Sequence, residues 1–366
     1  MGFFEKSSRI ELFSLVVIIL LITISLFPSC VGVKYSTNTS RGVRFYYTYN
    51  QFTDLIEHLQ EEHPDIFDYY SLGKTYEGRD IWLVKISDNV TINEDESEVL
   101  FMGGTHGDEK PAYQAVIYSM KAIVENYTSP NVNYSFTTRI RNIVNTTELF
   151  FIPMVNPDGI EAQTRKNRRI NDCILGDTMF RGVDINRNYG YKWEELDKHP
   201  LRYIYGSFPI PLKTTVKYPF FDFKSIIREG SYRGSNPFSE NESRAVKQFI
   251  ENNSIAIRID YHTSGEKILY PWSWTKEPPD DEPLFISIAD NISKINGYQI
   301  SQGSNWYYIL GNSGDWMYAE QGILPFTIEL CKSGFMHYFP IKSKILEICK
   351  THLLVNLYIA ERALML

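Results

Sequence analysis

The stretch Val99–Glu109, VLFMGGTHGDE, joins a short apolar run to a glycine-rich segment that carries imidazole and carboxylate side chains. Val99–Met102 predicts a buried strand, and the glycines after it allow a tight turn at the strand's carboxyl end. His106 and Glu109 lie three residues apart in that turn, a spacing that lets both side chains reach one metal ion. Because open α/β sheets bind ligands at the carboxyl ends of their strands, we expect a site here.

Helical and strand-like patterns alternate on both sides of this stretch. Helices are expected at Tyr49–His63, Pro111–Tyr127, Glu240–Glu251, Pro283–Ile295 and Ser343–Leu366, and further strands at Asp80–Ile86, Leu149–Val155, Ile255–Tyr261 and Leu324–Leu330. Such alternation is typical of a mainly parallel sheet that helices cover on both faces. We therefore expect one α/β domain over residues 45–366, with an irregular inserted surface segment at about residues 193–229.

The first 32 residues have the pattern of a targeting segment. Lys6 and Arg9 precede the uncharged run Leu12–Phe27, whose 16 residues are short for a membrane-spanning helix of about 20. We expect a cleaved secretory signal or, as the alternative, an uncleaved anchor at the outer face of a membrane. A polar lead-in at residues 33–44 would follow it.

Eight Asn-x-Ser/Thr sequons support a secreted, glycosylated protein. They are at Asn38, Asn89, Asn126, Asn133, Asn145, Asn241, Asn252 and Asn291. The four cysteines, Cys30, Cys173, Cys331 and Cys349, allow at most one disulfide once the leader is removed. The excess of 44 acidic over 37 basic side chains gives a net charge of −7, which argues against a nucleic-acid partner. We expect a monomer.

The seven histidines differ in what their neighbours allow. His58 and His63 are five residues apart, about 140° around a helix, and so cannot share one ion. His199, His337 and His352 have no carboxylate at ligand spacing. His262 directly follows the strand Ile255–Tyr261, so it should lie at the same edge of the sheet as His106. Since catalytic zinc takes three protein ligands and a water, His106, Glu109 and His262 predict one zinc site.

Several further motifs now give a resemblance to a known family. In chain order they are GTHGDE (Gly104–Glu109), NPDG (Asn156–Gly159), RKNR (Arg165–Arg168), VDINRN (Val183–Asn188), the strand-ending His262 and FTIEL (Phe326–Leu330). This ordered set resembles zinc metallocarboxypeptidases of the carboxypeptidase A type, from about Phe45 to the carboxyl terminus. With the alternation above, the resemblance implies a mixed, mostly parallel, twisted sheet of about eight strands with helices on both faces.

The resemblance also implies roles for individual residues. His106, Glu109 and His262 match the zinc ligands, and Asp184 matches the carboxylate that orients a ligand histidine.

Four more roles concern the substrate. Asn186 and Arg187 match the pair that holds the substrate's terminal carboxylate. Arg165 matches the cation that stabilises the oxyanion, with Arg168 as a competitor within the same motif. Tyr307 matches the tyrosine that closes over substrate, with Tyr308 as its direct competitor.

Glu329 matches the general base, and burial near the end of an apolar strand would raise its pKa. The chain departs from the family pattern at Asp108, where many digestive members carry arginine. It also has Gly314 where members set their side-chain preference.

These residues favour a secreted zinc carboxypeptidase that hydrolyses the last peptide bond of peptides or proteins. A zinc amidase, deacylase or cell-wall peptide hydrolase could use the same ligands, and a non-catalytic binding protein could share the fold. Asn186, Arg187 and Arg165 favour the first class because they specify a free carboxylate beside the scissile bond. The retained ligands and Glu329 argue against the binding protein.

Overall fold

The computed structural model describes residues 46–130, 134–169, 182–195, 232–333 and 340–366. The leader, the lead-in, most of the expected insertion, Cys30, Cys173, His199 and His337 therefore lie outside the described residues. The compact unit that contains the described residues spans Arg44–Leu366. No helix within the described residues combines the length and the apolar character needed to cross a membrane.

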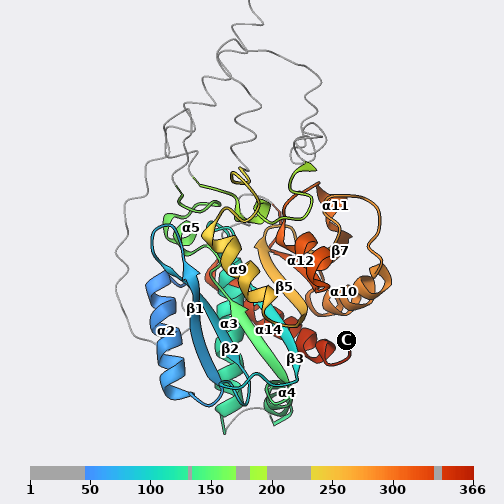
Figure 1. The fold of residues 1–366 in the computed structure, drawn as a ribbon. Coiled ribbons are helices and arrows are strands. Elements are labelled where there is room, and N and C mark those ends of the chain that lie inside the picture. Colours follow the sequence, from blue (N-terminus) through green and yellow to red (C-terminus); the bar gives the residue numbers. More distant parts are fainter. Residues whose placement is uncertain (1–45, 131–133, 170–181, 196–231, 334–339) are drawn as a thin grey trace, which may run out of the picture. The chain divides into compact units, whose positions relative to one another are not determined.

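One mixed sheet of eight strands organises this unit (Figure 1). Its strands are β1 Phe67–Lys74, β2 Asp80–Ile86, β3 Ser97–Met102, β4 Thr147–Ile152, β5 Ile255–Thr263, β6 Lys267–Tyr270, β7 Gln299–Gln302 and β8 Leu324–Leu330. They lie side by side in the order β1-β2-β4-β3-β5-β8-β6-β7. The pairs β4–β3, β3–β5, β5–β8 and β6–β7 are parallel, and the other three pairs are antiparallel. The predicted mixed, mostly parallel sheet of about eight strands is confirmed.

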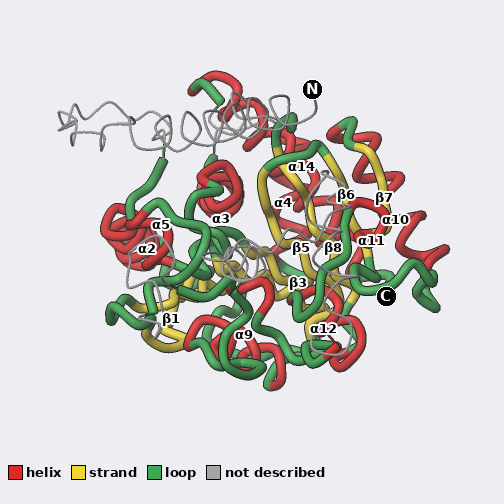
Figure 2. Tube along the Cα trace, turned by 90° about the horizontal axis from the view of Figure 1, so that it is seen from above, coloured by secondary structure: helices red, strands yellow, loops and turns green. Residues whose placement is uncertain are grey.

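Helices cover both faces of the sheet, as Figure 2 shows from above. On one face lie α2 Tyr49–Glu62, α3 Lys110–Thr128, α4 Tyr134–Val144, α10 Glu282–Asn296 and α14 Lys342–Ala363. On the other lie α9 Asn241–Glu251 and α12 Ser313–Gln321. The short helices α5 Pro157–Ala162, η2 Ile185–Arg187 and α11 Gly303–Trp306 lie in the connections. Two separate apolar clusters, one on each face, form the core.

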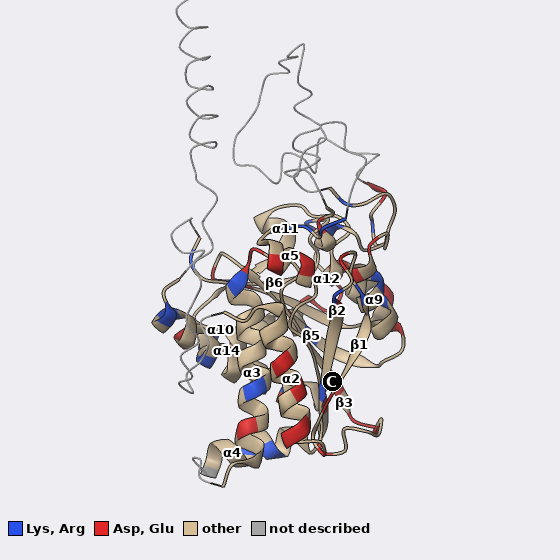
Figure 3. Ribbon diagram, turned by 90° about the vertical axis from the view of Figure 1, so that its left-hand side faces the viewer, with Lys and Arg blue, Asp and Glu red and all other residues tan. Residues whose placement is uncertain are grey.

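The local sequence explains where these elements begin and why they are buried. Thr48 caps α2 in a capping box with Gln51, and α2 ends before Pro64. The central strands β4, β5 and β8 are buried on both faces, as expected for strands between two helical layers. Charged residues occur on outer helices such as α2, α3 and α9, whereas most of the sheet is drawn as uncharged (Figure 3).

The expected strands Asp80–Ile86 and Leu324–Leu330 match β2 and β8 at both ends. The other expected elements are present with shifted bounds. For example, the strand expected at Leu149–Val155 is β4 at Thr147–Ile152, because Pro153 ends the ladder. Eight further elements were not predicted from the sequence, namely the strands β1, β6 and β7, the helices α4, α5, α11 and α12, and the short helix η2.

Candidate active site

Three neighbouring parallel strands bring the predicted site residues to one edge of the sheet. β3 ends at Met102 and leads directly into the turn that carries His106 and Glu109. His262 is the next-to-last residue of β5 and lies beside Glu329 of β8 in the strand register. Because β3, β5 and β8 are adjacent and parallel, their carboxyl ends meet at this edge.

The turn after β3 depends on glycine for its close packing. Gly104 has a φ of +65°, in the left-handed region that favours glycine. A Cβ on Gly107 would lie 1.9 Å from the carbonyl carbon of Gly159, so no other residue fits there. Gly159 belongs to the NPDG motif, whose Asn156 caps α5. The GTHGDE and NPDG motifs therefore pack against each other, and this contact fixes the position of His106.

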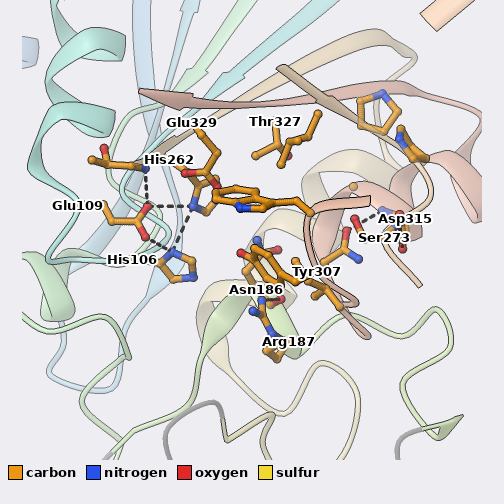
Figure 4. A pocket seen from close by; sticks show the side chains of 18 of the residues that line it. His106, Glu109, Asn186, Arg187, His262, Ser273, Tyr307, Asp315, Thr327 and Glu329 are labelled. Carbon is orange, nitrogen blue, oxygen red and sulfur yellow. Dashed lines mark hydrogen bonds and ion pairs between the residues drawn. The ribbon is translucent and has the colours of Figure 1, made fainter. Parts of the chain in front are cut away.

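His106, Glu109 and His262 converge on one buried point (Figure 4). The Nδ1 of His106 lies 2.8 Å from Oε1 of Glu109, and the Nδ1 of His262 lies 3.0 Å from Oε2 of the same carboxylate. The two Nδ1 atoms are 3.1 Å apart. One ligand atom from each residue lies within 4.8 Å of the others, so together they could hold a metal ion.

A second carboxylate lies at the outer nitrogen of each imidazole. The Nε2 of His106 lies 3.2 Å from Oδ1 of Asp184, and the Nε2 of His262 lies 3.1 Å from Oδ2 of Asp260. Each imidazole therefore has a carboxylate at both of its ring nitrogens. A metal ion bound at the two Nδ1 atoms would require the tautomer protonated at Nε2, in which Nε2–H donates to Asp184 in one ring and to Asp260 in the other. The donor set, two imidazoles and one carboxylate, suits zinc.

Cations hold both orienting carboxylates in their charged form. Arg165 donates through Nε to Oδ2 of Asp184 at 2.9 Å, and Arg258 donates through Nη2 to Oδ2 of Asp260 at 2.5 Å. Burial alone would raise the pKa of Asp184, but Arg165, Arg187 and His106 hold it well below its usual value. Burial likewise opposes ionisation of Asp260, yet Arg258 and His262 keep the pKa of that group lowered.

Arg165 and its competitor Arg168 differ in position. Arg165 also donates through Nη1 to Oε1 of Glu109 at 3.2 Å, so its guanidinium lies at the metal-binding group. Arg168 instead donates to Oε1 of Glu77 at 3.4 Å and is absent from the lining of the pocket. The structure therefore places Arg165, and not Arg168, at the metal-binding group.

The predicted substrate-binding residues face the same pocket. The Oδ1 of Asn186 accepts from the backbone N–H of Ser313 at 3.0 Å, which fixes the side chain at the start of α12. Arg187 donates through Nη1 to the backbone carbonyl of Asn186 at 2.8 Å, and other donors of its guanidinium remain for a ligand. Tyr307 lines the pocket whereas Tyr308 does not, so geometry favours Tyr307 over its neighbour.

The carboxyl group of Glu329 lies in an environment that disfavours its charged form. Its side chain is buried, and it lines the pocket beside His262 (Figure 4). Burial raises the pKa of Glu329 to about 7, with the charge of Glu109 adding to that effect and His262 opposing it. A carboxylate with a pKa near neutrality can both take up and release a proton.

The pocket extends from the metal-binding group toward α12. Figure 4 shows Asp315 and Ser273 at the end opposite to Glu109. Asp315 accepts from the backbone N–H groups of Ser273 and Trp274, and burial raises the pKa of Asp315 to about 6. Other residues that line this part are Leu269, Tyr270, Pro271, Ile309, Asn312, Gly314, Pro325 and Thr327.

Asp260 and Arg258 are the contributors that sequence reasoning missed. Both lie on β5, at spacings of two and four residues before His262, so they share its face of the sheet. Two charged side chains in an otherwise apolar strand (IAIRIDYH, Ile255–His262) were the available signal. The two charged residues identify the face of β5 that points toward the site.

Comparisons with known proteins agree with this geometry. A family model described as zinc carboxypeptidase matches residues 52–210 and 221–354. A zinc carboxypeptidase of Saccharothrix mutabilis subsp. capreolus is 29% identical over 315 residues, which cover 81% of this chain and 65% of the relative. Carboxypeptidase B of Astacus astacus is 27% identical over 305 residues, or 79% of this chain and 87% of the relative.

Solved structures show the same fold. Thrombin activatable fibrinolysis inhibitor superposes with a TM-score of 0.70 at 22% identity, over 87% of this chain and 75% of that chain. Carboxypeptidase A of Helicoverpa armigera superposes with a TM-score of 0.69 at 20% identity, over 90% of this chain and 76% of that chain. At these identities the likeness concerns the fold alone.

Proposed function

Because the chain belongs to the zinc carboxypeptidase family, we propose that it removes residues from the carboxyl end of peptides or proteins. The observation that carries this proposal is the position of Arg187 and Arg165, two guanidinium groups in one pocket with His106, Glu109 and His262. A guanidinium matches a carboxylate in both charge and geometry. Arg165 lies at the metal-binding group, and Arg187 lines the same pocket. This arrangement suits a substrate that has a free carboxylate next to its scissile bond.

The residues of this chain divide the reaction among them. A zinc ion held by His106, Glu109 and His262 would lower the pKa of a bound water toward about 7 and polarise the scissile carbonyl. Glu329 takes the proton from the attacking water and passes it to the leaving amine. This sequence of proton transfers needs no nucleophilic side chain and no covalent intermediate.

The cationic and aromatic side chains bind the substrate around that step. Arg165 stabilises the negative charge that develops on the carbonyl oxygen. Asn186 and Arg187 orient the terminal carboxylate, and Tyr307 covers the bound residue. Asp184 acts through His106, whose ring plane and tautomer it fixes.

Secretion is part of the same proposal. Its support is the targeting pattern of the first 32 residues together with sequon asparagines that lie exposed in the described unit, namely Asn89, Asn145, Asn241 and Asn252. We propose a monomer acting outside the cell, with attachment to a membrane only if the leader stays uncleaved.

The replacement Arg187→Ala tests the proposed carboxylate contact. Removing one partner of a desolvated charge pair costs about 2–5 kcal/mol, so kcat/KM on peptides with a free carboxylate should fall roughly 30-fold or more. C-terminally amidated peptides, which lack the carboxylate, should remain equally poor substrates of both enzymes. A variant that hydrolyses free-carboxylate peptides as fast as the parent enzyme would refute this role of Arg187.

A further inference from the structure

The pocket of the candidate active site follows one face of the neighbouring strands β5 and β8. Alternate residues of a strand share a face, and three register pairs lie in a row on this one. They are His262 with Glu329, Asp260 with Thr327, and Arg258 with Pro325. Since Glu329, Thr327 and Pro325 all line the pocket, it runs along the sheet for about four residues, or about 13 Å, away from the metal-binding group.

Gly314, the second residue of α12, lies at the far end of this pocket. It lines the pocket together with Asn312 and Pro325. A Cβ on Gly314 would lie 3.3 Å from Oδ1 of Asn312 and 3.7 Å from Nη1 of Arg258. The lack of a side chain at Gly314 therefore leaves room in front of the Asn312 amide and the Arg258 guanidinium.

Asn312 and Arg258 each present a donor that lacks an acceptor among the described residues. The two residues are only 6% and 0% exposed. Asn312 uses Oδ1 to accept from the backbone N–H of Asp315 at 2.9 Å, and within the described part of the chain its Nδ2 has no partner. Arg258 donates through Nη2 to Oδ2 of Asp260 and to Oγ of Ser313, each at 2.5 Å, whereas no residue that the structure describes accepts from its Nε or Nη1. Because a buried donor without an acceptor is costly, an acceptor on a bound ligand would stabilise both groups.

Asp260 adds an acceptor beside these donors. Its Oδ2 accepts from Nη2 of Arg258, while its Oδ1 is buried and no described residue donates to it. The charges of Arg258 and Asp260 cancel, because the two groups form a fully buried ion pair. Burying a further charge against this neutral pair would cost desolvation energy. This part of the pocket therefore favours a neutral group that can both donate and accept.

Asp315, the other carboxylate at this end of the pocket, is already bonded to the backbone. Its Oδ1 accepts from the N–H of Ser273 at 3.0 Å, and its Oδ2 accepts from the N–H groups of Ser273 and Trp274 at 3.0 and 3.1 Å. These charge-assisted hydrogen bonds occupy both oxygens, so Asp315 is not left as the partner of a cationic substrate side chain. Its negative charge also repels a carboxylate in that position.

We propose that this pocket recognises a carboxamide at the end of the substrate's last side chain, so that peptides ending in glutamine are preferred. The inference rests on the proposed carboxypeptidase function. The carboxamide oxygen accepts from Nδ2 of Asn312 and Nη1 of Arg258, and the carboxamide nitrogen donates to Oδ1 of Asp260. The length of the pocket, about 13 Å along the strands, favours glutamine over the shorter asparagine.

Four peptides that differ only in their last residue test this preference on the zinc-loaded protein. Glutamine, glutamate, methionine and lysine have long side chains, but only glutamine carries a neutral group that both donates and accepts. We expect kcat/KM for the glutamine peptide to be about tenfold or more above that for each of the others, because these leave buried polar groups unpaired or bury a charge. An equal or higher kcat/KM for any of the other three peptides would overturn the inference.

Two variants test whether the named residues produce the preference. Asn312→Asp keeps the oxygen that caps α12 and removes the Nδ2 donor, while Gly314→Ala places a methyl group in the space in front of Arg258. In both variants, the ratio of kcat/KM for the glutamine peptide to kcat/KM for the methionine peptide should fall about fivefold or more. The matched control is Asn50→Asp, which makes the same charge change at an exposed position of α2 and should keep the parent ratio. An unchanged ratio in Asn312→Asp or in Gly314→Ala would contradict the assignment.

The carboxypeptidase function and the carboxamide preference fail in different ways. If none of the four peptides loses its last residue, both proposals are overturned. If the methionine peptide is hydrolysed as fast as the glutamine peptide, the carboxypeptidase function stands and only the carboxamide preference is overturned.

Discussion

Each histidine of the metal-binding group is held by its own ion-paired carboxylate. Asp184 with Arg165 holds His106, and Asp260 with Arg258 holds His262. The two arrangements come from unrelated parts of the chain, yet both direct an Nδ1 atom toward Glu109. Orientation of both imidazoles before the metal arrives lowers the entropic cost of binding it.

The role of Glu329 can be separated from metal binding. Glu329→Gln keeps the shape of the side chain and removes the base, so kcat should fall by the roughly 10²–10⁴-fold typical of a lost acid–base group. Zinc content, measured by elemental analysis, should stay at one per chain because Glu329 is not among the metal-binding residues. Near-native turnover with zinc in place would show that another residue is the base.

Asp260 is expected to act through His262, and a pair of variants isolates that action. Asp260→Asn should weaken zinc binding about 10–100-fold, measured by competition with a chromophoric chelator. It also leaves Arg258 buried without its partner, which by itself lowers stability. The double variant Arg258→Met/Asp260→Asn should recover the Tm but not the zinc affinity. Recovery of both would mean that Asp260 serves only as the ion-pair partner of Arg258.

Sequence patterns identified residues of the site unevenly. His106 and Glu109 share one turn, and His262 ends a predicted strand, so simple spacing sufficed for them. Motif spacing favoured Arg165 over Arg168 and Tyr307 over Tyr308, and the coordinates add that only the first residue of each pair lines the pocket. Asp260 escaped because its contact with His262 depends on the two-residue period of a strand.

At the scale of elements, strands that are buried and long were predicted, whereas short or exposed strands were missed. β6 and β7 have only four residues each, and the edge strand β1 has an irregular pattern with only one buried residue. Their pairing is set by neighbours in the sheet, which no local pattern contains. The central strands carry enough apolar residues in sequence to be recognised alone.

The helix α14 contains a titratable group that couples stability to pH. His352 is buried between Tyr261 and Tyr298, and its Nδ1–H donates to the carbonyl of Ile348 at 2.9 Å. Burial lowers the pKa of His352 from 6.5 to about 4. Between these two pH values the unfolded chain binds a proton at this histidine and the native protein does not. The free energy of unfolding therefore decreases as the pH falls from 6.5 to 4.

This linkage predicts the slope of stability against pH. His352→Gln removes this titration. Between pH 6.5 and pH 4, the free energy of unfolding of the parent protein should therefore fall by up to about 3 kcal/mol more than that of the variant. Denaturant unfolding at a series of pH values measures this. The same replacement at His58, which lies exposed on α2, serves as the control for a histidine replacement outside the core. Parallel curves for His352→Gln and the parent protein would contradict the assignment.

On the scale of the whole described unit, the sheet gathers its site residues at one edge. The carboxyl ends of β3, β5 and β8 bring imidazoles, guanidinium groups and Glu329 together around the candidate zinc site. The α/β class followed from the alternation of patterns, and the mixed sheet of about eight strands followed from that alternation together with the family resemblance. The strand order, by contrast, depends on contacts between distant segments such as β5 and β8.

The central claim, a zinc-dependent exopeptidase that reads a free carboxylate, is tested most directly by mass spectrometry of one peptide in two forms. The account predicts that the peptide with a free carboxyl terminus loses single residues from that end. The same peptide with an amidated terminus should remain intact, and a zinc chelator should stop the reaction until zinc is restored. Cleavage at internal bonds, or equal hydrolysis of the free and amidated peptides, would contradict the account.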